Sequence, residues 1–240
     1  MTRLDLDQLS VGRDGFRLGA LDLQARGGEV IAVIGPNGAG KTTLLKTLAR
    51  LVPPLSGSAA IETNALCPVA YLPPPGAVAA GFSALHLTAL GRAARRGWSP
   101  GLAPADLEAA RAALTRLDVS DLADRPFDHL SSGQQQLVLV ARLMVQDAAV
   151  CLLDEPLAML DPAHATAIER AVRDLADAGR LVIASTHGLA FAARADRVIA
   201  LGPDGPAVLP PGEALSPARM AQLFGVAVTV CPCCGQPGVA

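Results

Sequence analysis

Hydrophobic and polar residues change their pattern several times along the chain, and each pattern predicts a different element. Apolar side chains roughly alternate with polar ones over residues 4–11, a glycine-rich turn follows at residues 12–15, and a second run covers residues 16–25. This order predicts an antiparallel β-hairpin. Residues 30–34 are all apolar, which is typical of a strand buried on both faces of a parallel sheet. A helix is expected over residues 41–51.

Uninterrupted apolar runs return in the second half of the chain, at residues 149–153, 181–185 and 198–201. Helical periodicity covers residues 162–178, between the first two of these runs. Asp161, followed directly by a proline, is a favourable N-cap for that helix. Strands that alternate with helices in this way indicate an α/β fold with a mostly parallel sheet.

The middle of the chain lacks this alternation of strands and helices. Helical runs near residues 83–91 and 104–117 flank a loop rich in Gly, Pro and Arg. We interpret it as a helical insertion into a single domain. The predicted organisation is a core of residues 1–74 and 149–225, a helical subdomain of about residues 75–148, and a C-terminal tail of residues 226–240.

Composition narrows the class of protein. Hydrophobic residues make up 51% of the 240 residues, and the formal net charge is −2, which disfavours a protein that binds nucleic acid through a basic surface. The apolar runs have strand length and stay below the roughly 18 residues of a membrane-spanning helix. We therefore expect a soluble, cytoplasmic protein. Its five cysteines are expected to be reduced thiols.

A glycine-rich loop joins the apolar run at residues 30–34 to the helix that follows. It fits the phosphate-binding pattern G-x-x-x-x-G-K-[ST]. Glycines let consecutive backbone N–H groups converge on phosphate oxygens, beside a helix N-terminus. Lys41 is expected to reach the β- and γ-phosphates, and the Thr42 hydroxyl to bind Mg²⁺. The alternative is a glycine-rich turn before a helix that carries a lysine by chance. The loop consists of Gly35, Pro36, Asn37, Gly38, Ala39, Gly40, Lys41 and Thr42.

Acidic and imidazole side chains follow two of the apolar strands. Asp154 and Glu155 end the run at residues 150–153, and His187 follows the run at residues 181–185. Ligands bind at the carboxyl ends of parallel strands, so Asp154 is expected to hold Mg²⁺ and Glu155 to act as general base toward water. Each position, taken alone, is also compatible with an ordinary strand end at the surface.

Residues 130–134, Leu-Ser-Ser-Gly-Gln, open another predicted helix. Two hydroxyl groups and a glycine at a helix N-terminus are compatible with an anion site or with a simple helix cap. The composition of the segment does not separate these two interpretations.

Taken in order, these segments resemble the ATP-binding cassette (ABC) ATPases along nearly the whole chain. Residues 35–43, including Thr43, resemble the Walker A loop, and residues 150–155 resemble Walker B with its catalytic glutamate. Residues 130–134 are similar to the signature LSGGQ, with Ser132 in place of the first glycine. Residues 157–161 resemble the D-loop, and His187 resembles the H-loop histidine.

The resemblance implies a P-loop NTPase fold, with ATP and Mg²⁺ as ligands, and a head-to-tail homodimer. Ser131, Gly133 and Gln134 of one subunit would close on the nucleotide held by Lys41 of the other, and Asp161 would belong to the same site. It also implies transmembrane permease subunits as partners, contacted by the helical insertion at the cytoplasmic face of the membrane. A solute-binding protein would act indirectly, and no nucleic acid is implied.

A finer similarity concerns residues 89–92 and the segment of residues 215–226. Both resemble uptake ATPases for ferric siderophores, haem and cobalamin. Two other classes remain as alternatives: an ABC ATPase that acts on DNA or ribosomes, and another P-loop NTPase such as a small-molecule kinase.

The chain departs from the family at several positions. Pro74 stands where the family has a glutamine, so hydrolysis is expected to be slower or less tightly coupled, and a catalytically weakened subunit is an alternative. Arg13 or Phe16 could stack on adenine, and this choice stays open. The C-terminal tail carries three closely spaced thiols, which lack the paired C-x-x-C spacing of structural zinc sites. We therefore expect a mobile tail with free thiols at Cys231, Cys233 and Cys234.

Overall fold

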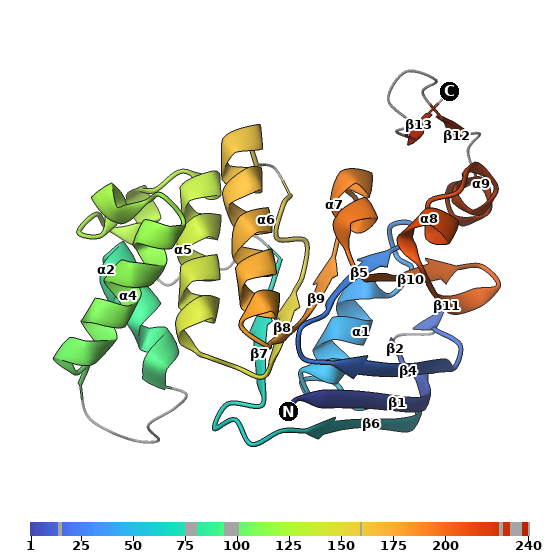
Figure 1. Ribbon diagram of the computed structural model, residues 1–240, viewed down its shortest axis with the longest axis horizontal. Coiled ribbons are helices and arrows are strands. Elements are labelled where there is room, and N and C mark those ends of the chain that lie inside the picture. The colour runs from blue at the N-terminus through green and yellow to red at the C-terminus, as the bar shows by residue number, and fades with distance from the viewer. Residues whose placement is uncertain are drawn as a thin grey trace.

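The computed structural model describes residues 1–13, 16–74, 81–93, 101–158, 160–225, 228–230 and 237–239. The side chains of Arg13 and Phe16 are outside this description. A six-stranded sheet with helices on both faces, a three-stranded sheet, two short two-stranded pairs and a separate group of helices make up the described fold (Figure 1).

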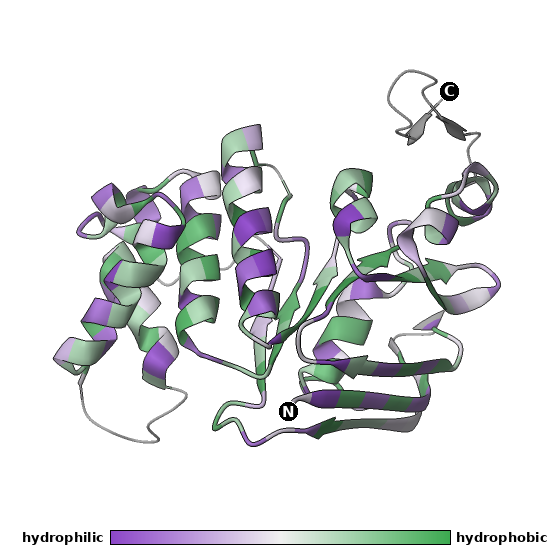
Figure 2. Cartoon of the chain, in the orientation of Figure 1, coloured by the Kyte–Doolittle hydropathy of each residue, from purple (hydrophilic) through white to green (hydrophobic). Residues whose placement is uncertain are grey.

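The larger sheet has six strands in the order β11-β10-β5-β9-β8-β7. Every strand pair is parallel except β10 with β11. All residues of β5, β8 and β9 are buried, which confirms that their continuous apolar runs lie inside a sheet covered on both faces (Figure 2). The strands are β5 (Val30–Ile34), β7 (Val69–Leu72), β8 (Val150–Leu153), β9 (Leu181–Ser185), β10 (Arg197–Gly202) and β11 (Gly205–Leu209).

Helices cover the two faces of this sheet. On one face, Leu44 and Leu48 of α1 (Lys41–Leu48) belong to the same buried cluster as Ile31 of β5. On the other face, Ile168 of α6 (Pro162–Asp177) clusters with Ala32. The short helix α7 (Leu189–Arg194) also packs against β5. Strand β5 divides its side chains between the two clusters because successive residues point to opposite faces.

The smaller sheet confirms the predicted N-terminal hairpin and adds one strand to it. Strand β1 (Arg3–Ser10) pairs antiparallel with β4 (Leu21–Arg26) and with β6 (Ser56–Glu62). Two short strands, β2 (Gly12–Arg13) and β3 (Phe16–Arg17), form a separate pair between β1 and β4. Strand β6 was not predicted, since its sequence SGSAAIE consists mostly of small residues with low strand propensity.

The predicted insertion is a group of three packed helices, which occupies the left of Figure 1. They are α2 (Ala84–Ala89), α4 (Pro104–Arg116) and α5 (Ser132–Val145), joined by 3₁₀ turns at Leu90–Arg92, Ser120–Leu122 and Phe127–His129. The side chains of Leu114, Phe127 and Leu137 are fully buried among these helices. The apolar positions at helical spacing therefore form the interior of this group.

The chain after β10 contains elements that the sequence did not predict. Strand β11 is followed by α8 (Pro211–Ala214) and α9 (Pro217–Phe224), and β12 (Val228–Val230) pairs with β13 (Pro237–Val239). Both helices are short and begin at a proline, in a segment whose Pro and Gly content does not by itself predict a helix. The three thiols at positions 231, 233 and 234 lie outside the described residues.

Some predicted boundaries were wrong. The helix predicted over residues 41–51 ends at Leu48, because Arg50 has a left-handed φ of 59° that a right-handed helix does not accommodate. The run of residues 16–25 is divided between β3 and β4. In the described part of the chain, no helix combines the length and the apolar character needed to span a membrane.

Gly91 packs closely against α5, and this contact inside the helical group can be tested by substitution. A Cβ atom added at Gly91 would overlap the carbonyl oxygen of Arg142 and lie 2.7 Å from Cγ2 of Val145, both in α5. We expect Gly91→Ala to lower the free energy of unfolding by about 1–3 kcal/mol, measured by urea denaturation. Gly212→Ala is the matched control, because nothing lies within 4 Å of that added Cβ; an equal loss in both variants would contradict the packing argument.

Candidate functional site

The glycine-rich loop between β5 and α1 has a backbone that other residues would not easily adopt. A side chain at Gly35 would place its Cβ 2.7 Å from the carbonyl oxygen of Leu201. Gly40, the N-cap of α1, has a left-handed φ of 92°, and no side chain caps this helix. The first amides of α1, with the positive end of its dipole, are thus available to an anion.

Lys41 begins α1 and is 5% exposed. Its Nζ donates hydrogen bonds to the carbonyl oxygens of Gly35 at 3.0 Å and Pro36 at 3.2 Å. Burial lowers the pKa of Lys41 below its ordinary value, while the charges of Glu155 and Asp154 oppose that shift. The ammonium group is therefore near enough to both acids predicted from the sequence for their charges to act on it.

The two acids lie where β8 ends, and their surroundings differ. Asp154 is fully buried: its Oδ1 accepts a hydrogen bond from Ser185 Oγ at 2.7 Å, and its Oδ2 accepts one from Tyr71 Oη at 3.1 Å. Glu155 is partly exposed, with 31% of its side chain accessible, and its Oε1 lies 2.9 Å from Nε2 of His187. Asp154 is suited to hold a fixed position, and Glu155 to exchange a proton with water.

Strand order explains why these residues meet. Strand β8 lies between β9 and β7, and β9 lies beside β5. Since all four strands are parallel, the glycine-rich loop, His187 and the two acids leave the sheet at the same edge. The structure therefore brings Lys41, Asp154, Glu155 and His187 to one edge of the sheet.

The donor atoms at this edge suit Mg²⁺. Thr42 and Thr43 are half-buried in the first turn of α1, and Asp154 offers a carboxylate in addition to its two hydroxyl contacts. Hydroxyl and carboxylate oxygens are the hard ligands that Mg²⁺ prefers, usually with several waters and substrate phosphates.

The segment Leu-Ser-Ser-Gly-Gln is a helix cap in this structure. The Ser131 hydroxyl accepts from the backbone N–H of Gln134, and the Gln134 side chain accepts from the N–H of Ser131, which is a capping box. Gly133 packs against His164 and Leu160, since an added Cβ would lie 3.3 Å from Nδ1 of His164. In Figure 1, α5 and α1 lie on opposite sides of β7 and β8, so this segment is not part of the Lys41 site of its own chain.

Asp161 caps α6, as the sequence predicted. Its Oδ1 accepts from the backbone N–H groups of Ala163 and His164, each at 3.0 Å. The hydrogen bond from the His164 amide is the main cause that lowers the pKa of Asp161 below its ordinary value. His164 therefore contacts both Gly133 and Asp161. The predicted signature segment and the end of the predicted D-loop segment lie side by side at this histidine.

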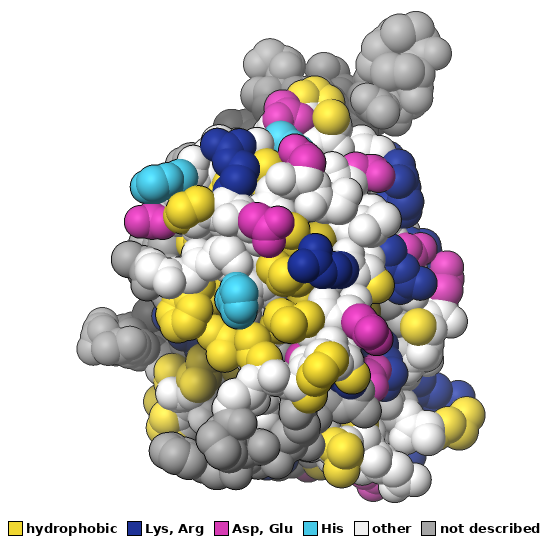
Figure 3. All heavy atoms as spheres, turned by 90° about the vertical axis from the view of Figure 1, so that its left-hand side faces the viewer, with side chains coloured by type: hydrophobic (Ala, Val, Ile, Leu, Met, Phe, Trp, Pro, Cys, Tyr) yellow, Lys and Arg dark blue, Asp and Glu magenta, His cyan; other side chains and the backbone are white. Residues whose placement is uncertain are grey.

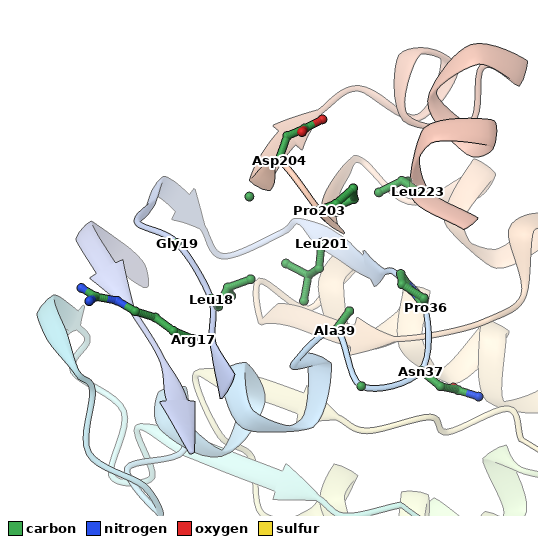
Figure 4. Close-up of a pocket in the computed structure, with 13 residues that line it drawn as sticks. Arg17, Leu18, Gly19, Pro36, Asn37, Ala39, Leu201, Pro203, Asp204 and Leu223 are labelled. Carbon is green, nitrogen blue, oxygen red and sulfur yellow. The ribbon is translucent and has the colours of Figure 1, made fainter. Parts of the chain in front are cut away.

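A cavity of about 670 Å³ lies beside the glycine-rich loop (Figure 4). Its wall includes Pro36 and Asn37 of the loop together with Leu18, Leu201 and Leu223. Leu18, one of the wall residues, is the first residue after β3, the strand in which Phe16 pairs with Arg13 of β2. This volume is within the range of small-molecule sites.

Tyr71 and Ser185 are site residues whose roles the sequence did not indicate. Both lie within apolar strands, where a hydroxyl-bearing side chain has no distinctive pattern. Only the pairing of β7 and β9 with β8 directs these hydroxyls at Asp154. The sequence offered one weak indication, which is that Ser185 is a polar residue at the end of an otherwise apolar strand.

Comparison with known proteins decides the family, because the model of the family described as "ABC transporter" matches residues 18–158. The chain belongs to the ABC transporter family. It is an ATP-binding, ATP-hydrolysing subunit of the kind that powers transport through a separate permease.

Curated relatives and a solved structure agree with this assignment. The hemin import ATP-binding protein HmuV of Myxococcus xanthus is 36% identical over 242 residues, which covers 93% of this chain and 90% of the relative. The manganese transport system ATP-binding protein MntB of Bacillus subtilis is 39% identical over 70% of each chain. An inward-facing metal-chelate type ABC transporter superposes with a TM-score of 0.87 at 25% identity, over 100% of this chain and 96% of that one.

The two lysines of the chain provide an internally controlled test of the phosphate site. We expect Lys41→Met to weaken ATP binding at least about tenfold, because it removes a charge-assisted contact to phosphate, whereas Lys46→Met in the same helix should change it less than about twofold, as for most surface substitutions. Equilibrium dialysis with labelled ATP measures both affinities. Equal affinities in the two variants would contradict the placement of phosphate beside Lys41.

Proposed function

We propose that this ABC ATPase binds Mg²⁺-ATP through residues 35–43 and hydrolyses it to drive import of a metal chelate, with haem the favoured cargo. The observation that carries the catalytic part is the arrangement of Lys41 with Asp154 and Glu155, in which Glu155 is hydrogen-bonded to His187. The proposal is supported by the presence of a cation, a buried carboxylate and a solvent-accessible carboxylate at one edge of the sheet.

Each residue has a defined task in this proposal. Backbone amides of the loop and Lys41 bind the phosphates, and Thr42 and Asp154 hold Mg²⁺, which neutralises charge on the phosphate oxygens when bound. Glu155 takes a proton from the attacking water, because its carboxylate is accessible to solvent. His187 orients that carboxylate through the 2.9 Å contact.

The cavity beside Pro36 is proposed to receive the nucleoside part of ATP. It adjoins the phosphate loop, and its wall continues into the β2–β3 pair that contains Arg13 and Phe16. A guanidinium plane or an aromatic ring can each stack on adenine, so both residues remain candidates for that contact.

A second copy of the chain is proposed to complete the site. Ser131 is exposed and Gln134 half-buried on a helix that lies apart from the Lys41 of the same chain. The contact that links Gly133 and Asp161 through His164 lets this surface approach a nucleotide as one unit. A head-to-tail homodimer would bring it onto the phosphates held by the partner, and Ser131, Gly133, Gln134 and Asp161 would then bind nucleotide.

The proposed membrane partner is a pair of permease subunits contacted at the cytoplasmic face of the membrane. The helical subdomain of about residues 75–148 is the proposed contact, between core segments 1–74 and 149–225. Figure 3 shows hydrophobic side chains gathered on this side of the molecule, and Phe82 next to α2 is 41% exposed. Burial of such side chains favours association. A solute-binding protein would deliver cargo to the permease without touching this chain.

Relatives support the cargo class. Several are named hemin import ATP-binding proteins, one is an achromobactin transport protein of Dickeya dadantii, and one a manganese transport protein. Co-expressing the chain with a permease encoded beside it, and measuring ATP-driven uptake of hemin, a ferric siderophore and Mn²⁺ into vesicles, tests the proposal. Uptake of none of the three would overturn it.

Substitution of the proposed base separates binding from hydrolysis. We expect Glu155→Gln to lower the ATP turnover number by about 10²–10⁴, because general-base catalysis is lost, while ATP affinity stays within about threefold. Phosphate release and equilibrium dialysis measure the two quantities. A turnover number near that of the unmodified protein would exclude Glu155 as the base.

The proline at position 74 is expected to slow hydrolysis. Pro73 and Pro74 are exposed at the end of β7, and proline has neither an N–H group nor a side-chain ligand to offer metal or water. Pro74→Gln should raise permease-stimulated turnover by about threefold to tenfold, the order of one hydrogen bond. If turnover with the permease does not rise, the proline is not what limits the rate.

A further inference from the structure

Two hydroxyl groups from neighbouring strands hold the carboxylate of Asp154. Ser185 Oγ donates to Oδ1 at 2.7 Å from β9, and Tyr71 Oη donates to Oδ2 at 3.1 Å from β7. The carboxylate plane is thus fixed from both sides.

The Ser185 hydroxyl makes a second hydrogen bond, for which Tyr71 has no counterpart. Its Oγ accepts a hydrogen bond of 2.8 Å from the backbone N–H of Glu155. One hydroxyl therefore bridges the side chain of the proposed metal ligand and the main chain of the proposed base. Ser185 is fully buried, which leaves this hydroxyl little freedom to adopt other contacts.

The backbone at Glu155 needs such a support. Its φ of 51° lies in the left-handed region, which costs a residue other than glycine of the order of 1–3 kcal/mol. This conformation turns the chain out of β8 so that the Glu155 side chain meets His187 at 2.9 Å. Removal of the amide contact would let the peptide relax and move the base.

We infer that Ser185 and Tyr71 are positioning residues for hydrolysis: together they orient Asp154 toward Mg²⁺, and Ser185 alone also orients Glu155 toward water. The inference rests on the proposed function. It assigns different effects to the two hydroxyls, which a merely structural role would not do. Tyr71 governs the metal contact only, whereas Ser185 governs both the metal contact and the chemical step.

The test measures metal binding separately from turnover. Mn²⁺ replaces Mg²⁺, and its electron paramagnetic resonance signal is titrated with protein and a non-hydrolysable ATP analogue, while ATP turnover is followed at saturating metal. The variants are Ser185→Ala, Ser185→Thr and Tyr71→Phe. Ser10→Ala is the matched control, because Ser10 is also a buried serine, with its Oγ bonded to the Leu18 carbonyl oxygen at 2.7 Å.

Expected results differ from one variant to the next. Tyr71→Phe and Ser185→Ala should each weaken Mn²⁺ binding about tenfold, which is the order of a lost hydrogen bond to a charged group. Only Ser185→Ala should also lower the turnover number at saturating metal about tenfold or more, and Ser185→Thr should restore most of it. Ser10→Ala should lower the urea midpoint without changing either quantity.

Three outcomes would overturn the inference. The first is a folded Ser185→Ala variant whose Mn²⁺ affinity and turnover number match those of the unmodified protein. The second is that Ser185→Ala and Ser10→Ala change the Mn²⁺ affinity and the turnover number equally. If Ser185→Ala does not fold, Tyr71→Phe decides, and unchanged Mn²⁺ binding in that variant is the third. Absence of nucleotide-dependent Mn²⁺ binding in the unmodified chain would instead overturn the proposed function.

Discussion

The balance of buried charge at the carboxyl edge of the parallel sheet is the constraint on which the site depends. Lys41 is 5% exposed and Asp154 is fully buried, and a buried charge without partners is strongly unfavourable. The acids offset part of the desolvation of the ammonium, and hydroxyl donors satisfy the carboxylate. In the proposed site, an arriving triphosphate would therefore meet groups whose positions are already fixed, which would reduce the reorganisation needed for catalysis.

The order of the strands produces this balance. Strands β5, β9, β8 and β7 are adjacent and parallel, so four consecutive strands contribute the glycine-rich loop, the histidine, the acids and the tyrosine. Two helices of the sheet's opposite faces, α1 and α6, begin at this same edge. A slip of one residue in any strand would reverse its side chains, and the site would lose a member.

The helical group has a separate role from the sheet. Its interior is closed around Phe127, and the capping box at Ser131 and Gln134 fixes the start of α5. His164 joins the start of this helix to the start of α6. The surface proposed to meet a partner's nucleotide therefore lies in contact with Asp161 and His164, which follow Glu155 in the chain.

The sequence by itself determined the family and the parallel strands and located the glycine-rich loop that is proposed to bind phosphate, since these depend on local patterns: continuous apolar runs, glycines before a helix, and acids at a strand end. Tertiary structure alone decided the contacts of Tyr71 and Ser185 with Asp154, because strand register brings together residues separated by 83 and 31 positions. It also decided β6, whose mostly small residues have low strand propensity, and the two short helices α8 and α9, which begin at prolines in a segment rich in Pro and Gly. Long-range pairing, which no local pattern encodes, is the physical reason for the difference.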